Sequence, residues 1–336
     1  MITAIYEGQK DVAIKEVETP HASNNDVVVR NLYSSICGTD VAVYFHGPNT
    51  GHKVDVGGEF GHETICEIVE VGKDVKDLHV GDIVYPYPLY AKDDTKRAGT
   101  LSGFSEYMLL PNCVNNKSVF KLKENISIKE GCLIEPFTVA CHAAARSQPK
   151  PKETAIVLGA GTIGLGAAIS LKYFGCEKVM IVDLSDFRLE KAKNLGFEVC
   201  NSQKENLKEK AMKYFGEAYS LHGTTADVDI YIDAAGASSI LETYQSMGKI
   251  QSRMVVVAVS KAKKEVDILD MTYSQHAIIG SGGYSMDDVQ DVMNIMASKK
   301  WDIESLITHE YRLDDICEAL EMAHDVDQSL NVVIHF

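Results

Sequence analysis

The feature that most restricts how this 336-residue chain can fold is a glycine-rich turn near its middle. The turn reads Gly159-Ala160-Gly161-Thr162-Ile163-Gly164, directly after the apolar run 154–158 and at the start of an amphipathic pattern over 163–174. In this context the first glycine permits a tight turn, the second lets a pyrophosphate approach the backbone, and the third lets helix and strand pack closely. The start of the helix offers unpaired N–H groups to phosphates. The turn therefore predicts a dinucleotide-binding unit.

An acidic residue follows at the distance that such a unit requires. Asp183 ends the next apolar run, 179–182, and lies 19 residues after Gly164 (183 minus 164). A carboxylate there accepts hydrogen bonds from a ribose diol and repels a 2′-phosphate, so the sequence favours NAD over NADP. Arg188 leaves two alternatives open, because its guanidinium could accept a phosphate or stack beside the adenine.

The chain is organised around this unit. The first part is β-rich, with strands predicted at 26–30 and 64–71, and a short helix is predicted after Glu135-Pro136. Strands and helices then alternate, which is typical of βαβ units on a parallel sheet. We predict further strands at 178–182, 228–232, 254–259 and 277–280, and helices near 186–195, 237–247 and 286–298. The tail repeats a strand, a helix and a strand, at 306–308, 314–324 and 331–335.

These patterns predict an α/β fold with three segments. The first is a β-rich domain over 1–140, and the second is a doubly wound parallel-sheet domain over 141–284. The third, 285–336, follows the sixth strand that a dinucleotide fold needs, so we expect it to pack back on the first domain.

Composition limits the partners of the chain. Acidic residues outnumber basic ones by 48 to 33, for a formal net charge of −15, which argues against nucleic-acid and anionic-membrane partners. No run approaches the about 20 apolar residues of a membrane helix, and the N-terminus lacks a signal-peptide pattern. Eight scattered cysteines without a C-x-x-C pair predict reduced thiols. We therefore expect a cytoplasmic protein.

Three separated segments carry potential metal ligands. Cys37-Gly38-Thr39-Asp40 follows one predicted strand, Gly61-His62-Glu63 precedes another, and Glu135 stands where the pattern changes. Taken singly, these residues have ordinary explanations: a small buried cysteine, a structural histidine and a loop acid. Together they supply a thiolate, an imidazole and one or two carboxylates, a mixed set that suits zinc with an open coordination position.

These motifs give the chain a resemblance to the zinc-dependent medium-chain alcohol dehydrogenases, closest to the sorbitol and 2,3-butanediol dehydrogenase branch. The resemblance covers nearly the whole length and includes Gly81-Asp82-Ile83-Val84, Gly103-Phe104-Ser105-Glu106-Tyr107 and Asp183-Leu184-Ser185. It implies a GroES-like catalytic domain interrupted by a Rossmann domain. It also implies a small alcohol or polyol as substrate and a homo-oligomer, a dimer or a tetramer.

The resemblance also implies roles for individual residues. Cys37, His62 and Glu135 resemble the zinc ligands, and Glu63 resembles a nearby carboxylate that ligates directly or through water. Asp40 resembles the acid that orients the ligand histidine. Thr39 resembles the hydroxyl that passes the alcohol proton outward. The aromatic residues expected at the substrate pocket are Tyr44, Phe104 and Tyr284, with core packing as the alternative.

The sequence departs from the family pattern at several positions. Ala42 stands where many relatives have a relay histidine, so we expect the proton to leave through ribose and water. Residues 85–102 contain no cysteine, and Cys113 is too isolated for a four-thiolate site, so we expect one catalytic zinc per chain and no structural zinc. Cys66 replaces a usual glycine, either as a packing residue or near the metal.

The implied reaction is the reversible oxidation of a secondary alcohol, a polyol or vicinal diol, to a ketone, with hydride transfer to NAD. An L-threonine 3-dehydrogenase is a near alternative, although no buried cation for the substrate carboxylate is evident. A zinc-free quinone or enoyl reductase is disfavoured by Cys37, His62 and Asp183. A non-catalytic NAD-binding protein is favoured only by Ala42. Measured zinc content would distinguish a zinc-free reductase from an alcohol dehydrogenase. Measured turnover would distinguish a non-catalytic protein from either enzyme.

Overall fold

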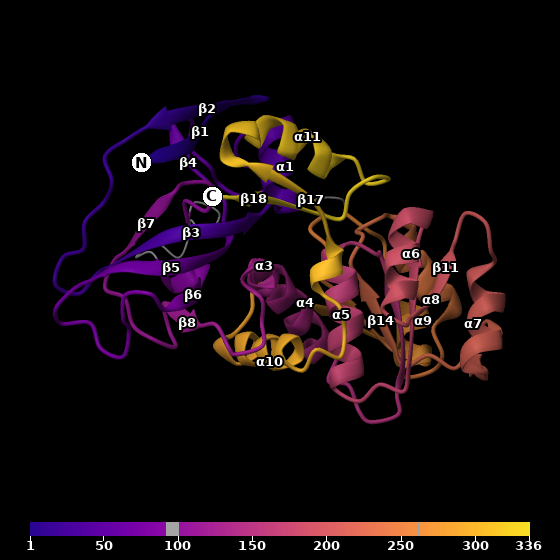
Figure 1. Cartoon of the computed structure of the whole chain (residues 1–336). Coiled ribbons are helices and arrows are strands. Elements are labelled where there is room, and N and C mark those ends of the chain that lie inside the picture. The colour runs from indigo at the N-terminus through magenta and orange to yellow at the C-terminus, as the bar shows by residue number, and fades with distance from the viewer. Residues whose placement is uncertain (92–100, 261–262) are drawn as a thin grey trace. The chain divides into compact units, whose positions relative to one another are not determined.

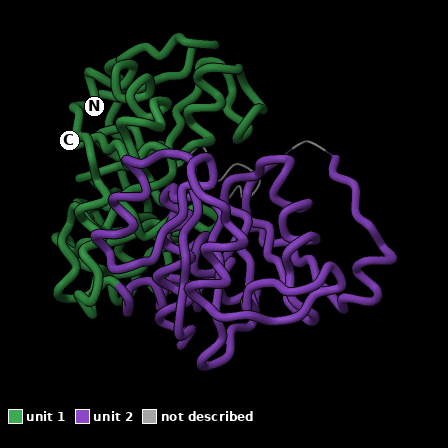
Figure 2. Tube along the Cα trace, turned by 90° about the vertical axis from the view of Figure 1, so that its right-hand side faces the viewer, with its two compact units in different colours: residues 1–135, 296–336 green, residues 136–295 purple. Residues whose placement is uncertain are grey.

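A computed structural model describes residues 1–91, 101–260 and 263–336. The chain divides into two compact units, which Figure 2 colours separately: unit 1 contains residues 1–135 and 296–336, and unit 2 contains residues 136–295. Helices α4 (Ile134–Arg146) and α10 (Met286–Ala297) extend across the two borders. The sequence predicts these borders at 140 and 284, positions that lie inside unit 2.

Strands dominate unit 1. Its larger sheet contains seven strands, six of which follow one another across the sheet while the seventh pairs with β3. In order they are β17 (Ile307–Arg312), β18 (Asn331–His335), β3 (Val27–Ser35), β5 (Glu63–Val71), β6 (Ile83–Pro86) and β8 (Val119–Lys121), with β7 (Tyr107–Leu110) on β3. The smaller sheet consists of β2 (Asp11–Glu16), β1 (Ile2–Gly8) and β4 (Gly58–Glu59).

The tail of the chain completes unit 1. Strand β18 pairs with β3 in antiparallel register, and α11 (Ile316–His324) lies beside α1 (Gly38–His46), as Figure 1 shows. Ile334, Leu320 and Val43 share one hydrophobic core with the start of the chain. The tail from residue 296 thus belongs to the same unit as the start of the chain. The short helices of this unit are α2 (Pro88–Ala91), α3 (Ile128–Gly131) and the 3-10 turns Glu304–Leu306 and Leu313–Asp315.

Unit 2 contains a six-stranded sheet in which every neighbouring pair is parallel. The order is β11 (Glu198–Asn201), β10 (Lys178–Asp183), β9 (Thr154–Leu158), β14 (Ile230–Asp233), β15 (Arg253–Val256) and β16 (Ala277–Gly280). Numbered along the chain this order is 3-2-1-4-5-6, the doubly wound Rossmann arrangement. The predicted fold class is therefore confirmed.

Helices flank this sheet in Figure 1. Besides α4 and α10 they are α5 (Thr162–Tyr173), α6 (Asp186–Asn194), α7 (Leu207–Phe215), α8 (Ser239–Met247) and α9 (Ile268–Ser274). A hairpin of β12 (Glu217–Ser220) and β13 (Gly223–Ala226) follows α7. None of the helices in the described part of the chain is long and apolar enough to cross a membrane.

Candidate metal and dinucleotide sites

Strand register brings two predicted ligand segments together in unit 1. Strands β3 and β5 are antiparallel, with Ser35 opposite Glu63. Cys37 comes just after β3 and His62 just before β5, so both lie at the same end of this strand pair. Gly61 has a φ of +87°, and a Cβ there would lie 2.7 Å from the buried ring of Phe104. A glycine is therefore needed for the turn that delivers His62.

The start of α1 holds Cys37 through its neighbours. The Thr39 hydroxyl donates to Cys37 Sγ at 3.0 Å, and the Cys37 N–H donates to Asp40 Oδ2 at 3.1 Å. The other oxygen, Asp40 Oδ1, lies 3.7 Å from His62 Nδ1, and both of these buried atoms lack a hydrogen-bond partner. The Asp40 carboxylate is thus placed between the backbone of one predicted ligand and the ring of another.

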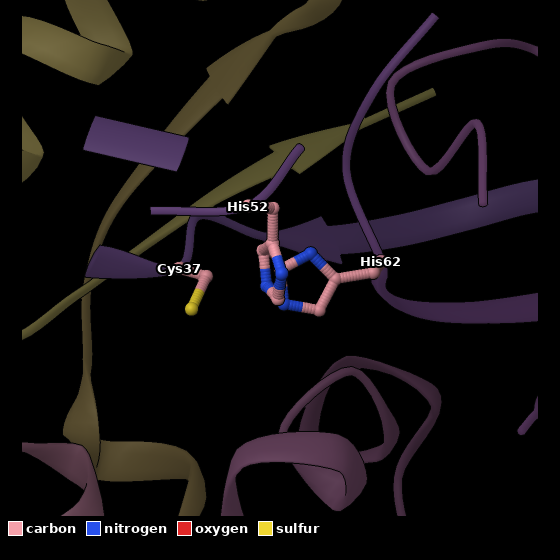
Figure 3. A group of neighbouring side chains, drawn as sticks. All are labelled: Cys37, His52 and His62. Carbon is pink, nitrogen blue, oxygen red and sulfur yellow. The ribbon is translucent and has the colours of Figure 1, made fainter. Parts of the chain in front are cut away.

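The ligand atoms form two overlapping sets, each with all atoms within 4.8 Å of one another. One set contains Cys37, His52 and His62, and the other contains His62, Glu63 and Glu135. Figure 3 shows the first set, in which two imidazole rings meet next to the cysteine side chain. The structure therefore gathers the four residues that the sequence assigned to zinc around His62. It places the Cys37 thiol and the Glu135 carboxylate in different sets.

Sequence reasoning missed His52. This half-buried residue lies in the loop between α1 and β4, and its ring meets the His62 ring edge to face, with centroids 4.5 Å apart. The available signal was a Gly-His pair, Gly51-His52, which repeats Gly61-His62 and lies between the two ligand segments. No spacing rule singled it out, because the path of the loop determines where His52 lies.

The electrostatics of the cluster suit a divalent cation. Burial raises the pKa of Asp40 to about 8 and the pKa of Glu63 to about 7. Burial, with the nearby carboxylates, also raises the pKa of the Cys37 thiol. Burial lowers the pKa of His52 and of His62, which favours the neutral imidazole that binds metals. A positive ion among these groups would stabilise the deprotonated forms of the buried acids and the thiol. This set of sulfur, nitrogen and oxygen donors fits zinc.

In unit 2, backbone geometry explains the glycines of the predicted dinucleotide turn. Gly159 has a φ of +114°, and a Cβ on Gly164 would lie 1.8 Å from the carbonyl oxygen of Gly159. Gly161 caps the N-terminus of α5, whose first turn contains Thr162 and Ile163. The turn therefore presents an open helix N-terminus, where backbone N–H groups are available to phosphates.

Asp183 joins the end of β10 to this turn. Its Oδ2 accepts the N–H of Ala160 at 2.6 Å, and its Oδ1 accepts the N–H groups of Leu184 and Ser185 at 2.7 and 2.9 Å. Carboxylate oxygens have several lone pairs, so these bonds leave acceptor capacity for a ribose. Arg188 Nη1 also reaches the turn, because a Cβ on Gly161 would lie 3.6 Å from it.

The three predicted pocket residues lie in different surroundings. Tyr44 is 4% exposed within the core of unit 1, where its ring meets Phe45 edge to face. Phe104 is fully buried in the same core and packs against Phe60. Tyr284 is half-buried in unit 2. The structure thus gives Tyr44 and Phe104 the core contacts that the sequence analysis kept as the alternative.

Two cysteines that depart from the family pattern, Cys66 and Cys113, are buried in the structure. Cys66 is buried, and its thiol donates to Asn31 Oδ1 at 3.0 Å. Cys113 is buried in the same core cluster as Cys66. Half of the cysteine-free segment 85–102 lies outside the described residues, which resume at 101.

Unit 1 contains a cluster of a thiol, imidazoles and carboxylates, and unit 2 contains a dinucleotide turn on a Rossmann sheet. This combination defines a metal-dependent oxidoreductase. Residues 23–123 match the alcohol dehydrogenase GroES-like domain family, and residues 162–298 match the zinc-binding dehydrogenase family. The chain belongs to the zinc-type medium-chain alcohol dehydrogenases, which are zinc- and NAD-dependent enzymes.

Individual relatives span nearly the whole chain. The (R,R)-butanediol dehydrogenase of Bacillus subtilis is 28% identical, over 95% of this chain and 94% of its own length. Sorbitol dehydrogenase 1 of Saccharomyces cerevisiae is 26% identical over 94% and 92%, and the L-threonine 3-dehydrogenase of Proteus mirabilis is 27% identical over 94% and 93%. The crystal structure of 2R,3R-butanediol dehydrogenase from Bacillus subtilis superposes with a TM-score of 0.85, at 25% identity over 100% and 99%.

Proposed function

We propose that this alcohol dehydrogenase acts on a polyol or vicinal diol, which it interconverts with the corresponding ketone using NAD. The observation that carries the proposal is the pair of buried carboxylates, Glu63 and Glu135, next to His62. Carboxylates accept hydrogen bonds, which a substrate with a second hydroxyl group can donate. The butanediol and sorbitol dehydrogenases among the relatives support the same substrate class.

We assign zinc binding to Cys37, His62 and Glu135, with Glu63 as a further carboxylate, and one ion to each chain. When bound, zinc supplies a Lewis acid that makes the substrate hydroxyl more acidic. Asp40 accepts the Cys37 N–H, and we assign its other oxygen, 3.7 Å from His62 Nδ1, the orientation of the His62 ring. Thr39 carries the hydroxyl beside the thiol, and we assign it the transfer of the alcohol proton.

We assign NAD binding to the turn that starts α5 and to the carboxylate of Asp183. The helix N-terminus binds the pyrophosphate, and the carboxylate accepts hydrogen bonds from the adenosine ribose. Arg188 lies close enough to the turn to contact the same nucleotide. A homo-oligomeric state and a cytoplasmic location stay predictions from the sequence.

A second candidate is oxidation of L-threonine. The 27% identical L-threonine 3-dehydrogenase favours it, because it matches over the same length as the other relatives. Its substrate carries a carboxylate, which would need a cationic partner at a buried site. A neutral polyol carries no charge that must be paired at the site.

The test is the initial rate of NAD reduction by the zinc-loaded enzyme across a substrate panel. The panel contains sugar alcohols, the stereoisomers of 2,3-butanediol, simple secondary alcohols and L-threonine, each repeated with NADP. We expect the highest kcat/KM for a polyol or diol with NAD. Turnover of L-threonine alone would replace the proposal with the second candidate.

Cys37→Ser provides the matched test of the metal assignment. Serine keeps the size of the side chain but removes the thiolate, so zinc retention and alcohol oxidation should fall together while NADH binding survives. NADH binding by fluorescence and zinc content by elemental analysis report on the two units separately. A fully active, zinc-loaded variant would contradict the ligand assignment.

A further inference from the structure

The loop that contains His52 is fixed onto helix α1 at two points. Gly51 packs directly on Thr39: a Cβ at position 51 would lie 2.3 Å from the Thr39 carbonyl oxygen. The Thr50 hydroxyl lies 2.8 Å from the Ala42 carbonyl oxygen and 2.6 Å from that of Gly47, to which it donates. Thr50 thus attaches the loop to the second half of α1, and Gly51 packs against its first turn. Together these contacts hold the loop next to Cys37.

This attachment directs the His52 ring to the metal cluster. The ring lies edge to face on His62, and the ligand atoms of Cys37, His52 and His62 all lie within 4.8 Å of one another (Figure 3). Donors around a tetrahedral zinc ion with bonds of about 2.0–2.3 Å lie roughly 3.5 Å apart. Small rotations of the three side chains therefore suffice to close the set around one ion.

We infer that His52 is a protein ligand of the metal, and that Cys37, His52 and His62 hold the ion in the enzyme without substrate. This inference rests on the proposed metal site and changes its set of ligands in the substrate-free state. One thiolate and two imidazoles make three protein ligands and leave the fourth position of a tetrahedral ion open. Glu135 belongs to the other set around His62, so His52 takes the place of Glu135 in the substrate-free state.

The test is zinc affinity, measured by competition with a chromophoric chelator on substrate-free enzyme. His52→Gln keeps a polar side chain of similar length but removes the imidazole. Loss even of a residue that only supports a metal ligand typically weakens binding about 10- to 100-fold, so we expect at least this loss. His21→Gln is the matched control, because the His21 side chain is 80% exposed and lies beside Glu70 at the surface. Its zinc affinity should equal that of the wild type.

X-ray absorption of the zinc-loaded, substrate-free enzyme gives a second readout. We expect scattering from two imidazoles in the wild type and from one in His52→Gln. Unchanged zinc affinity in His52→Gln together with scattering from a single imidazole in the wild type would overturn the inference. Cys37→Ser separates this result from failure of the metal site itself: if Cys37→Ser loses zinc and His52→Gln does not, only the role of His52 is wrong.

His52→Cys keeps the inference testable if His52→Gln folds poorly. With Co²⁺ bound in place of zinc, a cysteine at position 52 would supply a second thiolate to the metal. The thiolate-to-cobalt charge-transfer absorption should then be stronger than in the wild type, which has one thiolate. Absorption equal to the wild type would place side chain 52 outside the metal shell and overturn the inference.

Discussion

At the scale of single residues, Asp183 combines two tasks in one carboxylate. It accepts three backbone N–H groups, one from the glycine turn and two from the start of the next loop. These bonds fix the carboxylate at the position where a ribose is expected, and its negative charge opposes a 2′-phosphate. A substitution that removes the charge but keeps one of the two acceptor oxygens therefore tests specificity, with loss of the backbone hydrogen bonds that the other oxygen accepts.

Asp183→Asn is this substitution. Hydrogen bonds to a charged group contribute about 1.5–3 kcal/mol, so the preference for NAD over NADP, as a ratio of kcat/KM values, should fall about 10- to 100-fold. Steady-state rates with both cofactors measure the ratio, and Glu190→Gln, at an exposed position of α6, should leave it unchanged. An unchanged preference in Asp183→Asn would assign the choice to another residue, with Arg188 the first to examine.

Single residues also differ in how far their roles could be predicted. The segments around Cys37 and His62 carry short motifs next to strands, so their proximity followed from strand pairing. His52 carries no motif, and its position depends on the contact of Gly51 with Thr39, which no local pattern encodes. Tyr44 and Phe104 are aromatic residues that suit a pocket or a core equally well, and only the packing of unit 1 assigns them to the core.

At the scale of elements, the connection from β9 to α5 is the most tightly constrained part of unit 2. A Cβ on Gly164 would lie 1.8 Å from the carbonyl oxygen of Gly159, which must therefore move if any side chain is added. That oxygen belongs to the turn that presents the N-terminus of α5. The third glycine of the motif thus maintains the geometry on which nucleotide binding depends.

Gly164→Ala should therefore weaken NADH binding strongly, at least about 10-fold, since overpacking of this kind costs about 1–3 kcal/mol and distorts the turn itself. Gly282→Ala is the control, because a Cβ there meets nothing within 4 Å. Fluorescence titration of NADH with both variants measures the effect. Equal affinity in the two variants would mean that the turn relaxes without loss of the binding geometry.

The strands of the parallel sheet were predictable where an apolar run stands between turns or charged residues. Strands β9, β10 and β16 lie at the predicted positions within one residue, because each is a compact apolar run bounded by turns or charges. Strand β11 begins and ends with polar residues, Glu198 and Asn201, and α7 has a polar sequence with Ala211 and Phe215 as its buried residues. The sequence analysis did not predict these two elements, since tertiary packing rather than local pattern defines them.

At the scale of the whole molecule, unit 1 is assembled from the two ends of the chain. Strand β18 pairs with β3, which leads into the Cys37 turn, and α11 packs beside α1. Unit 2 has its own core, formed by residues that include Ile156, Tyr231 and Met254. The metal cluster therefore depends on the tail, whereas the dinucleotide turn is built on a separate core.

Ile334→Ala tests this division. Ile334 is fully buried on β18 in the core that also contains Val41 and Val43 of α1, and Ile→Ala at a buried site costs about 2–5 kcal/mol. We expect zinc release at lower denaturant concentration, because the lost stability falls on unit 1, while the denaturant midpoint of NADH binding moves less. Ile268→Ala, with its side chain 67% exposed, is the control and should change stability by less than about 0.5 kcal/mol. Equal shifts of both midpoints in Ile334→Ala would show that the units unfold as one cooperative body, in which case the tail supports the dinucleotide turn as much as the metal cluster.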